Sequence, residues 1–171
     1  WSNGETGESI TLTQADVDTT ITVTASYTDG EGTEESKTST ATSSVANVND
    51  APTGSVTISG TPTQGQVLTA SNNIADVDGM GTITYTWSNE ETGESITLTQ
   101  ADVGNQITVT ASYTDGGGTE ESITSTATSA VTNVNDAPSG TVTISGTVKE
   151  DEILTAVTSD LSDEDGFASF S

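Results

Sequence analysis

Acidic and amide side chains recur in three kinds of short string, and they carry the most specific chemistry in the chain. The strings are the hexapeptide NVNDAP, at residues 47–52 and again at 133–138, the loops DVDG and DEDG, and the string TDG. Calcium takes six to eight oxygen ligands from carboxylates, amides and backbone carbonyls on turns that can wrap a cation. The predicted calcium ligands are Asn49, Asp50, Asp76, Asp78 and Asp115 at one site, and Asn135, Asp136, Asp163 and Asp165 at another.

A second interpretation of these strings is that Asp, Asn and Gly favour turns, with no ligand involved. The dipeptide DG alone is weak evidence for a metal. In the string TQADV, Thr99 stands three residues before Asp102, which is the spacing of a capping box around one helical turn. We therefore expect Asp102 and its counterpart Asp16 to cap backbone N–H groups before they bind any cation.

The composition excludes several classes of function. Asp and Glu number 26 against only two cations, Lys37 and Lys149, for a net charge of -24. Nucleic acids and anionic membranes require clustered cations, and no apolar run reaches the length of a membrane span, so neither partner is expected. The chain has no His and no Cys, and aromatic residues make up only 4%. Without a usual general base or an aromatic-lined cleft, we expect no enzyme and no catalytic residue.

The sequence repeats itself at long range. Trp1 and Trp87 both begin the string WSN, and the two copies of NVNDAP have the same spacing of 86 residues. A period of this length indicates tandem domains. The expected organisation is the C-terminal half of one repeat (1–46), a linker (47–51), a complete repeat (52–132), a second linker (133–137) and the N-terminal half of a third repeat (138–171).

Within a repeat, apolar and polar residues alternate, which predicts half-buried β-strands. The string QITVTASY directs Ile107, Val109, Ala111 and Tyr113 to one face, with Thr and Ser on the other. Six or seven such strands separated by turn strings predict an all-β fold of tandem antiparallel immunoglobulin-like β-sandwiches. Trp87 should lie on a central strand and in the core.

This topology brings the candidate ligands together. In such a sandwich, the loop after the second strand, the loop before the last strand and the start of the first strand lie at one end. The linker that enters the complete repeat should therefore sit beside Asp76, Asp78 and Asp115. Carboxylates gathered in this way repel one another in the absence of a cation.

The strings TLTQADVGNQITVTASYTDGGGTEES and TSTATSAVTNVNDAP resemble the tandem immunoglobulin-like repeats of giant bacterial adhesins, many of them secreted RTX-type proteins. NVNDAP is also similar to the linkers of cadherins, where a related string binds calcium between domains. The resemblance implies an extracellular extender segment, at the cell surface or secreted, that is stiffened by calcium and serves adhesion and biofilm formation. Because Asn47 stands where cadherins carry Asp, the number of ions per junction stays open.

Two other functions remain open at this point. One is a module that binds a glycan or a protein through its loops or a sheet face. The other is a subunit of a self-assembling extracellular filament, in which half-repeats of different chains complete each other. The expected partners are accordingly the neighbouring repeats of the same chain and, in the filament, other copies end to end.

Overall fold

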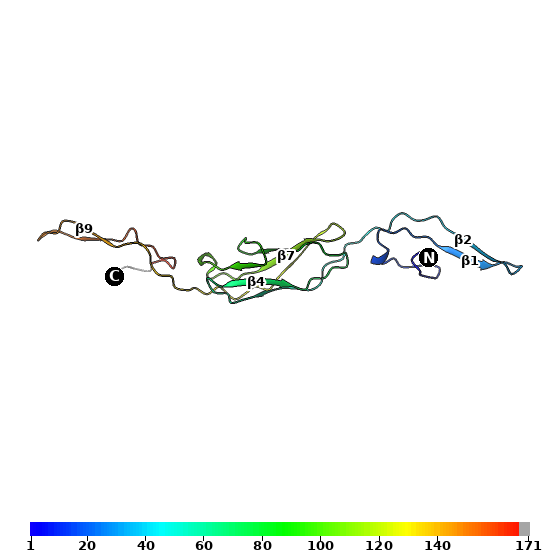
Figure 1. Cartoon of the computed structure of the whole chain (residues 1–171), viewed down its shortest axis with the longest axis horizontal. Helices are drawn as coiled ribbons and strands as arrows, with labels where there is room; N and C mark the ends of the chain where they lie inside the picture. The colour runs from blue at the N-terminus through cyan, green and yellow to red at the C-terminus, as the bar shows by residue number, and fades with distance from the viewer. Residues whose placement is uncertain (168–171) are drawn as a thin grey trace. The chain divides into compact units, whose positions relative to one another are not determined.

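The computed structural model describes residues 1–167, so the end of the expected third half-repeat, residues 168–171, lies outside the described part. The fold is all-β with antiparallel sheets, and two single 3-10 turns interrupt the strands (Figure 1). The elements are η1 (Gln14–Asp16), β1 (Thr24–Thr28), β2 (Glu34–Thr38), β3 (Val56–Ser59), β4 (Val67–Asn72), β5 (Thr84–Trp87), β6 (Ser95–Thr97), η2 (Gln100–Asp102), β7 (Val109–Thr114), β8 (Glu120–Thr124), β9 (Thr143–Ser145) and β10 (Thr155–Val157).

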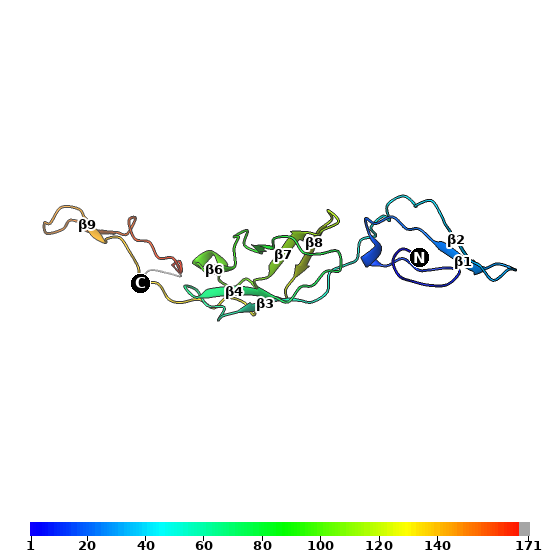
Figure 2. The same ribbon diagram turned by 45° about the vertical axis from the view of Figure 1, so that its right-hand side comes forward.

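The strands form two hairpins and two three-stranded sheets. β1 pairs with β2 and β9 pairs with β10, each pair antiparallel. In the complete repeat the strand orders are β3-β4-β6 and β5-β7-β8. β4 is antiparallel to both of its neighbours, with Leu68 opposite Ile96. Figure 2 shows β3 and β4 in one layer and β7 in another, an arrangement consistent with a β-sandwich.

Residue contacts divide the described chain into two compact units. The first comprises Trp1–Gly54, Asn73–Ile83 and Ser112–Ile123. It therefore contains the first half-repeat, the first linker and two loops of the complete repeat, which are the β4–β5 loop (residues 73–83) and the β7–β8 loop (residues 115–119). The second comprises Ser55–Asn72, Thr84–Ala111 and the chain from Thr124 onward. It contains most of the sandwich core and the second linker.

The alternation of residues decides which side chains form the core. In β7 and the residues before it, Ile107, Val109, Ala111 and Tyr113 are buried, as the sequence predicted. Trp87 is 2% exposed and donates its indole N–H to the Gly93 carbonyl at 2.9 Å. The remaining buried apolar residues of the second unit come from the β3-β4-β6 sheet and from the segments that follow β6 and β8: Val56, Leu68, Ala70, Ile96, Leu98 and Val131.

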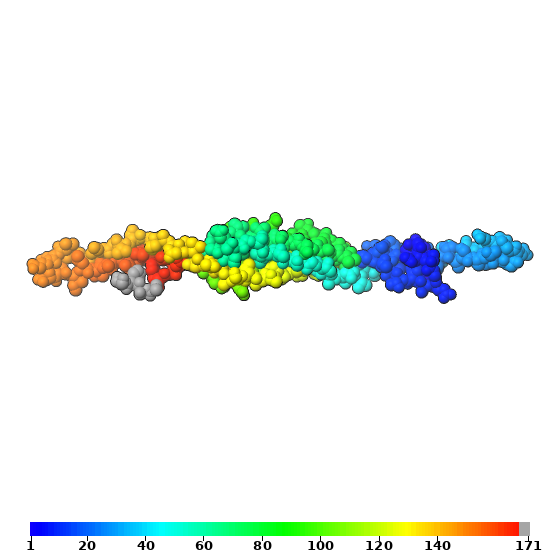
Figure 3. All heavy atoms as spheres, turned by 90° about the horizontal axis from the view of Figure 1, so that it is seen from below, coloured from blue at the N-terminus to red at the C-terminus, as the bar shows by residue number. Residues whose placement is uncertain are grey.

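The same strings are exposed in the two half-repeats, each of which supplies one sheet with no second sheet facing it in the described residues. Tyr27 in β1 is 61% exposed, whereas its counterpart Tyr113 is 4% exposed. Leu154, beside β10, is 48% exposed, whereas its counterpart Leu68 is 0% exposed. In Figure 3 the segment around β9 and β10, in orange, is not covered by other segments on the face shown. Burial in this fold therefore depends on two sheets facing each other, because neither sheet can bury its apolar face alone.

Side-chain hydroxyls extend the sheet beyond the end of β8. Val109 N–H donates to Ser125 Oγ at 3.1 Å, and Ile107 N–H donates to Thr128 Oγ1 at 3.0 Å. β8 ends at Thr124, since these hydroxyls replace backbone carbonyls as acceptors. The first half-repeat has the same contacts, Val23 with Ser39 and Ile21 with Thr42.

Among residues 1–167, no helix is long and apolar enough to cross a membrane.

Candidate functional site

The first linker lies against two loops of the complete repeat, all within the first structural unit. The backbone N–H of Asp50 donates to Asp78 Oδ2 at 2.6 Å, and Asn49 Nδ2 donates to Glu121 Oε1 at 2.8 Å. The amide of Asn47 lies next to the β7–β8 loop, beside Asp115. The linker thus binds the following repeat through both backbone and side chains. We call this set of contacts the first junction.

The two loops are held together by a close backbone contact. Gly116 N–H donates to the carbonyl oxygen of Asp78 at 3.1 Å. A Cβ atom on Gly116 would lie 2.3 Å from that same oxygen, so only glycine permits this approach. Gly81 has a similar role, because a Cβ there would lie 2.3 Å from the Thr114 carbonyl oxygen. The glycine of the TDG string therefore fixes the position of one acidic loop against the other.

Hydrogen bonds also orient the carboxylates of the β4–β5 loop. Asp76 Oδ1 accepts the backbone N–H of Asp78 at 2.9 Å, and Asp76 Oδ2 accepts the hydroxyl of Tyr113. Burial raises the pKa of Tyr113 well above its usual range, and the negative charge of Asp76 adds to the effect. Tyr113 therefore stays protonated and remains a donor to Asp76. Both oxygens of Asp76 have a partner inside the protein.

Three other oxygen atoms at the first junction are buried and have no hydrogen-bond partner. They are Oδ1 of Asn47, Oδ1 of Asp78 and Oδ2 of Asp115. Asp78 is 8% exposed and Asp115 is 6% exposed, so neither carboxylate is solvated as an ordinary surface group would be. Each of these two carboxylates uses its other oxygen to hold backbone, from Asp50 N–H and from Thr119 N–H respectively. A buried acceptor without a partner costs about 1–3 kcal/mol, and more when it is charged.

The residue types at this junction fit a calcium ion better than a transition metal. The unpartnered atoms are two carboxylate oxygens and one amide oxygen, which are the hard ligands that calcium prefers. Within residues 1–167 no three acidic, His or Cys side chains cluster closely enough to hold a metal by themselves. A cation at this junction would therefore need the Asn47 amide and backbone carbonyls or water in addition to Asp78 and Asp115. In this arrangement the ion would neutralise both carboxylates and connect the linker to both loops.

The second junction repeats the central contact of the first. The backbone N–H of Asp136 donates to Asp165 Oδ2 at 2.8 Å, as Asp50 does to Asp78. The other oxygen of Asp165 accepts Asn133 Nδ2 at 2.7 Å. Gln64, in the turn between β3 and β4, donates to Asp136 Oδ2 at 2.7 Å and accepts the Val134 N–H at 3.0 Å. The linker is therefore bound by the repeat it leaves as well as by the one it enters.

The remaining predicted ligands have identifiable contacts. Asp163 Oδ1 accepts the backbone N–H of Asp165 at 3.0 Å, which shapes the DEDG turn as Asp76 shapes DVDG. Asn135 donates its amide to the carbonyl of Asp136 within the linker at 3.0 Å. Of the three carboxylates predicted to meet the first linker, Asp78 accepts the Asp50 N–H and Asp115 lies in the loop beside the Asn47 amide, whereas the contacts of Asp76 are with Asp78 and Tyr113. Their binding of calcium stays a prediction.

Sequence reasoning missed three residues at the junctions: Asn47, Glu121 and Gln64. Asn47 opens the NVNDAP string, so the repetition of that string was a signal for it. Glu121 belongs to the string TEES, whose pattern is typical of a solvated strand edge, but it accepts a hydrogen bond from Asn49. Nothing in the turn string TPTQGQ distinguishes Gln64 as a contact of the linker.

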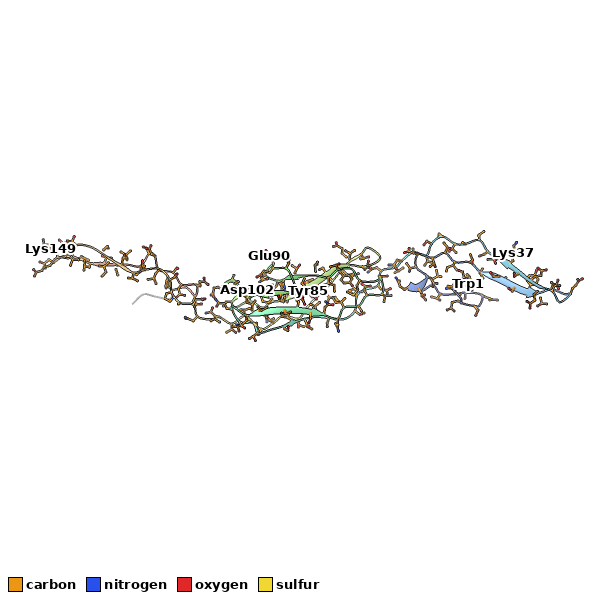
Figure 4. The ribbon with its side chains drawn as sticks, in the orientation of Figure 1. Trp1, Lys37, Tyr85, Glu90, Asp102 and Lys149 are labelled. Atoms are coloured by element: carbon orange, nitrogen blue, oxygen red, sulfur yellow. The ribbon has the colours of Figure 1, made fainter. Side chains whose placement is uncertain are left out.

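Asp16 and Asp102 cap the two 3-10 turns, as the sequence predicted. Asp102 (Figure 4) accepts the backbone N–H and the hydroxyl of Thr99 at 2.8 and 2.9 Å, and the amide of Asn89 at 3.0 Å. Burial alone would raise the pKa of Asp102, but the hydrogen bonds from Thr99 and Asn89 outweigh it and lower the pKa. The pKa of Asp16 is lowered as well, chiefly by the backbone N–H of Thr13. With these bonds made, neither carboxylate has the unpartnered buried oxygen found at the first junction.

Comparisons of the chain with protein-family models, with curated proteins and with solved structures found no significant match.

Proposed function

We propose that this chain is an extender segment of an extracellular adhesin, in which tandem immunoglobulin-like repeats hold a distal binding domain away from the cell. Two observations support the proposal together: the sequence repeats every 86 residues, and each linker binds the repeat that follows it. A chain of such units has a mechanical role, so it needs reproducible junctions and no cleft. Calcium at the junctions would supply the stiffness.

The observation that carries the proposal is the set of unpartnered oxygens on Asn47, Asp78 and Asp115. Ordinary turn residues direct their polar atoms to water or to the backbone, whereas these three are buried between linker and loops. A cation would replace the missing partners and remove the repulsion between carboxylates, which in water is about 1 kcal/mol per pair at 4 Å and greater when the pair is buried. The net charge of -24 supports the same function, because it draws cations to the chain and keeps neighbouring arrays apart.

Thermal unfolding of the whole chain with calcium tests the metal. Calcium at 100 times its Kd should stabilise the folded state by about 2.7 kcal/mol, provided that it does not bind the unfolded chain. Sodium at matched ionic strength should have a much smaller effect, since it screens charge without coordinating it. An equal response to sodium and calcium would indicate that the acidic loops are ordinary solvated turns and bind no calcium ion.

The two copies of the TDG string provide a matched pair of variants. Asp115→Asn alters the first junction, whereas Asp29→Asn alters the same loop position in the first half-repeat, where no linker is bound. We expect the first variant to lose most of the calcium-dependent stabilisation and the second to retain it. Equal losses in both would place the effect in the loop and not in the junction.

Small-angle scattering tests the mechanical part of the proposal. With calcium the average dimensions of the chain should be larger than after chelation, while circular dichroism reports unchanged strand content. Stiffness that survives chelation would show that the linker contacts suffice without an ion, and would overturn the role of calcium but not the extender function.

A further inference from the structure

The two copies of the loop between the last two strands differ at one position that faces the linker. The first copy reads TDGEGTEES and the second TDGGGTEES, so Glu31 corresponds to Gly117. The rest of these nine-residue strings is identical. Only the second copy has a linker bound to it in the described chain.

Gly117 leaves the space in which the linker asparagine lies. A Cβ atom on Gly117 would be 2.8 Å from Asn47 Nδ2 and 3.3 Å from Asp115 Oδ1. The first distance is too short for the present position of the Asn47 amide, so this amide would have to move, and a full glutamate would extend much further into the same space. A carboxylate there would also approach Asp115, so it is disfavoured by charge as well as by volume.

The loop itself accepts glutamate at this position. In the first copy, Asp29 Oδ1 accepts the N–H groups of Glu31 and Thr33 at 2.9 and 2.8 Å. In the second copy, Asp115 Oδ1 accepts the N–H of Thr119, the counterpart of Thr33, at 2.7 Å. Gly117 does not have the positive φ that would require glycine. The turn therefore does not require glycine at 117, and the space beside this glycine is occupied by the linker amide.

From these contacts we propose that the residue at this loop position determines whether a linker docks on the repeat. Glycine, as at 117, admits the linker asparagine, and glutamate, as at 31, excludes it. The proposal concerns docking and does not depend on calcium.

The variant Gly117→Glu tests this inference in the whole chain, with Glu31→Gly as the matched control. The direct measurement is the side-chain amide signal of Asn47 in ¹⁵N NMR, identified by its loss in Asn47→Ala. In Gly117→Glu this signal should move to the position of a solvent-exposed amide, with and without calcium. In Glu31→Gly it should stay unchanged, because that loop holds no linker.

The consequence for the linker can be measured with a pair of spin labels, since the chain contains no other cysteine. Thr40→Cys and Thr126→Cys place the labels at exposed positions on either side of the junction. Gly117→Glu should broaden the distance distribution, Asn47→Ala should broaden it similarly, and the double variant should be no broader than either. Circular dichroism verifies that each variant is folded.

Two results would overturn the inference. One is an unchanged amide signal and distance distribution in Gly117→Glu. The other is an additive effect in the double variant, because the glutamate would then act elsewhere than on Asn47. Neither measurement requires calcium to bind. The docking proposal and the calcium proposal can therefore be refuted independently of each other.

Discussion

Trp87 and Trp1 offer a test of the core in which the same residue occurs in two environments. Trp87 lies in the complete repeat and is 2% exposed, whereas Trp1 lies in the half-repeat and is only half-buried. Both donate the indole N–H to the carbonyl of a glycine, Gly93 and Gly7, at 2.9 and 3.0 Å. Comparing the two positions therefore measures how much burial against an opposing sheet contributes to the free energy of unfolding.

The expected loss of stability on truncating Trp87 follows from the buried area of its side chain. A tryptophan buries about 150–250 Å², and at about 25 cal/mol per Å² this corresponds to roughly 4–6 kcal/mol as an upper bound. Truncation of large aromatic residues in cores costs about 3–5 kcal/mol. We expect Trp87→Ala to lower the free energy of unfolding by about 4 kcal/mol, which is comparable to the whole stability of a small domain. Trp1→Ala should cost less than half as much.

Urea unfolding followed by circular dichroism measures both changes, and Trp87→Phe provides a milder variant if Trp87→Ala does not fold. The fluorescence of each single-tryptophan protein is an independent check. Emission from Trp87 should be shifted to the blue relative to Trp1. A cost below about 1 kcal/mol, typical of surface substitutions, or the emission of an exposed indole at Trp87, would refute the two-layer core.

Three further predictions concern particular contacts. Gly116→Ala should destabilise the chain by about 1–3 kcal/mol in urea unfolding, because its Cβ meets a backbone oxygen, whereas Gly30→Ala, with nothing within 4 Å, should be nearly neutral. Ser125→Ala leaves a buried N–H without an acceptor and should cost about 1–3 kcal/mol, more than Ser39→Ala at the exposed counterpart. Because the pKa of Asp102 is lowered by folding, its stabilisation is present above the ordinary aspartate pKa and is lost as the pH falls through the folded value. Asp102→Asn should therefore be less stable than the parent at pH 7 but should lose less stability between pH 5 and pH 2, measured by thermal unfolding.

Period-two patterns predicted much of the core because each apolar residue of a strand faces the same layer. That is why Ile107, Val109 and Ala111 could be assigned from QITVTASY alone. The end of β8 could not be predicted, since Ser125 stands at an inward position of the pattern and Thr128 at an outward one, yet the hydroxyls of both accept hydrogen bonds from backbone N–H groups. Periodicity identifies a face, and it does not identify which atom satisfies a given N–H.

The candidate site was predicted at the level of segments and not of atoms. Strand topology was enough to bring the linker to Asp78 and Asp115. The unpartnered oxygen of Asn47 depends on how one amide packs against Gly117, which no spacing in the sequence encodes. The binding of the second linker by Gln64 is likewise a contact between distant segments, and a single repeat read alone gives no sign of it.

The hairpins of successive repeats are nearly identical and differ at one strand position, which is Lys37 in β2 and Ile123 in β8. Thr24 and Thr38 join their hydroxyls across β1 and β2 at 2.8 Å, and Thr110 and Thr124 do the same at 2.8 Å across β7 and β8. A strand of one repeat could therefore pair with the partner strand of the other, and within these strands the exchange of Lys37 for Ile123 is the one difference that distinguishes the native pairing. It is favoured by chain connectivity, because a short turn closes far faster than a loop that spans a whole domain. Correct pairing in such an array therefore depends on each hairpin closing before the strands of its neighbour become available.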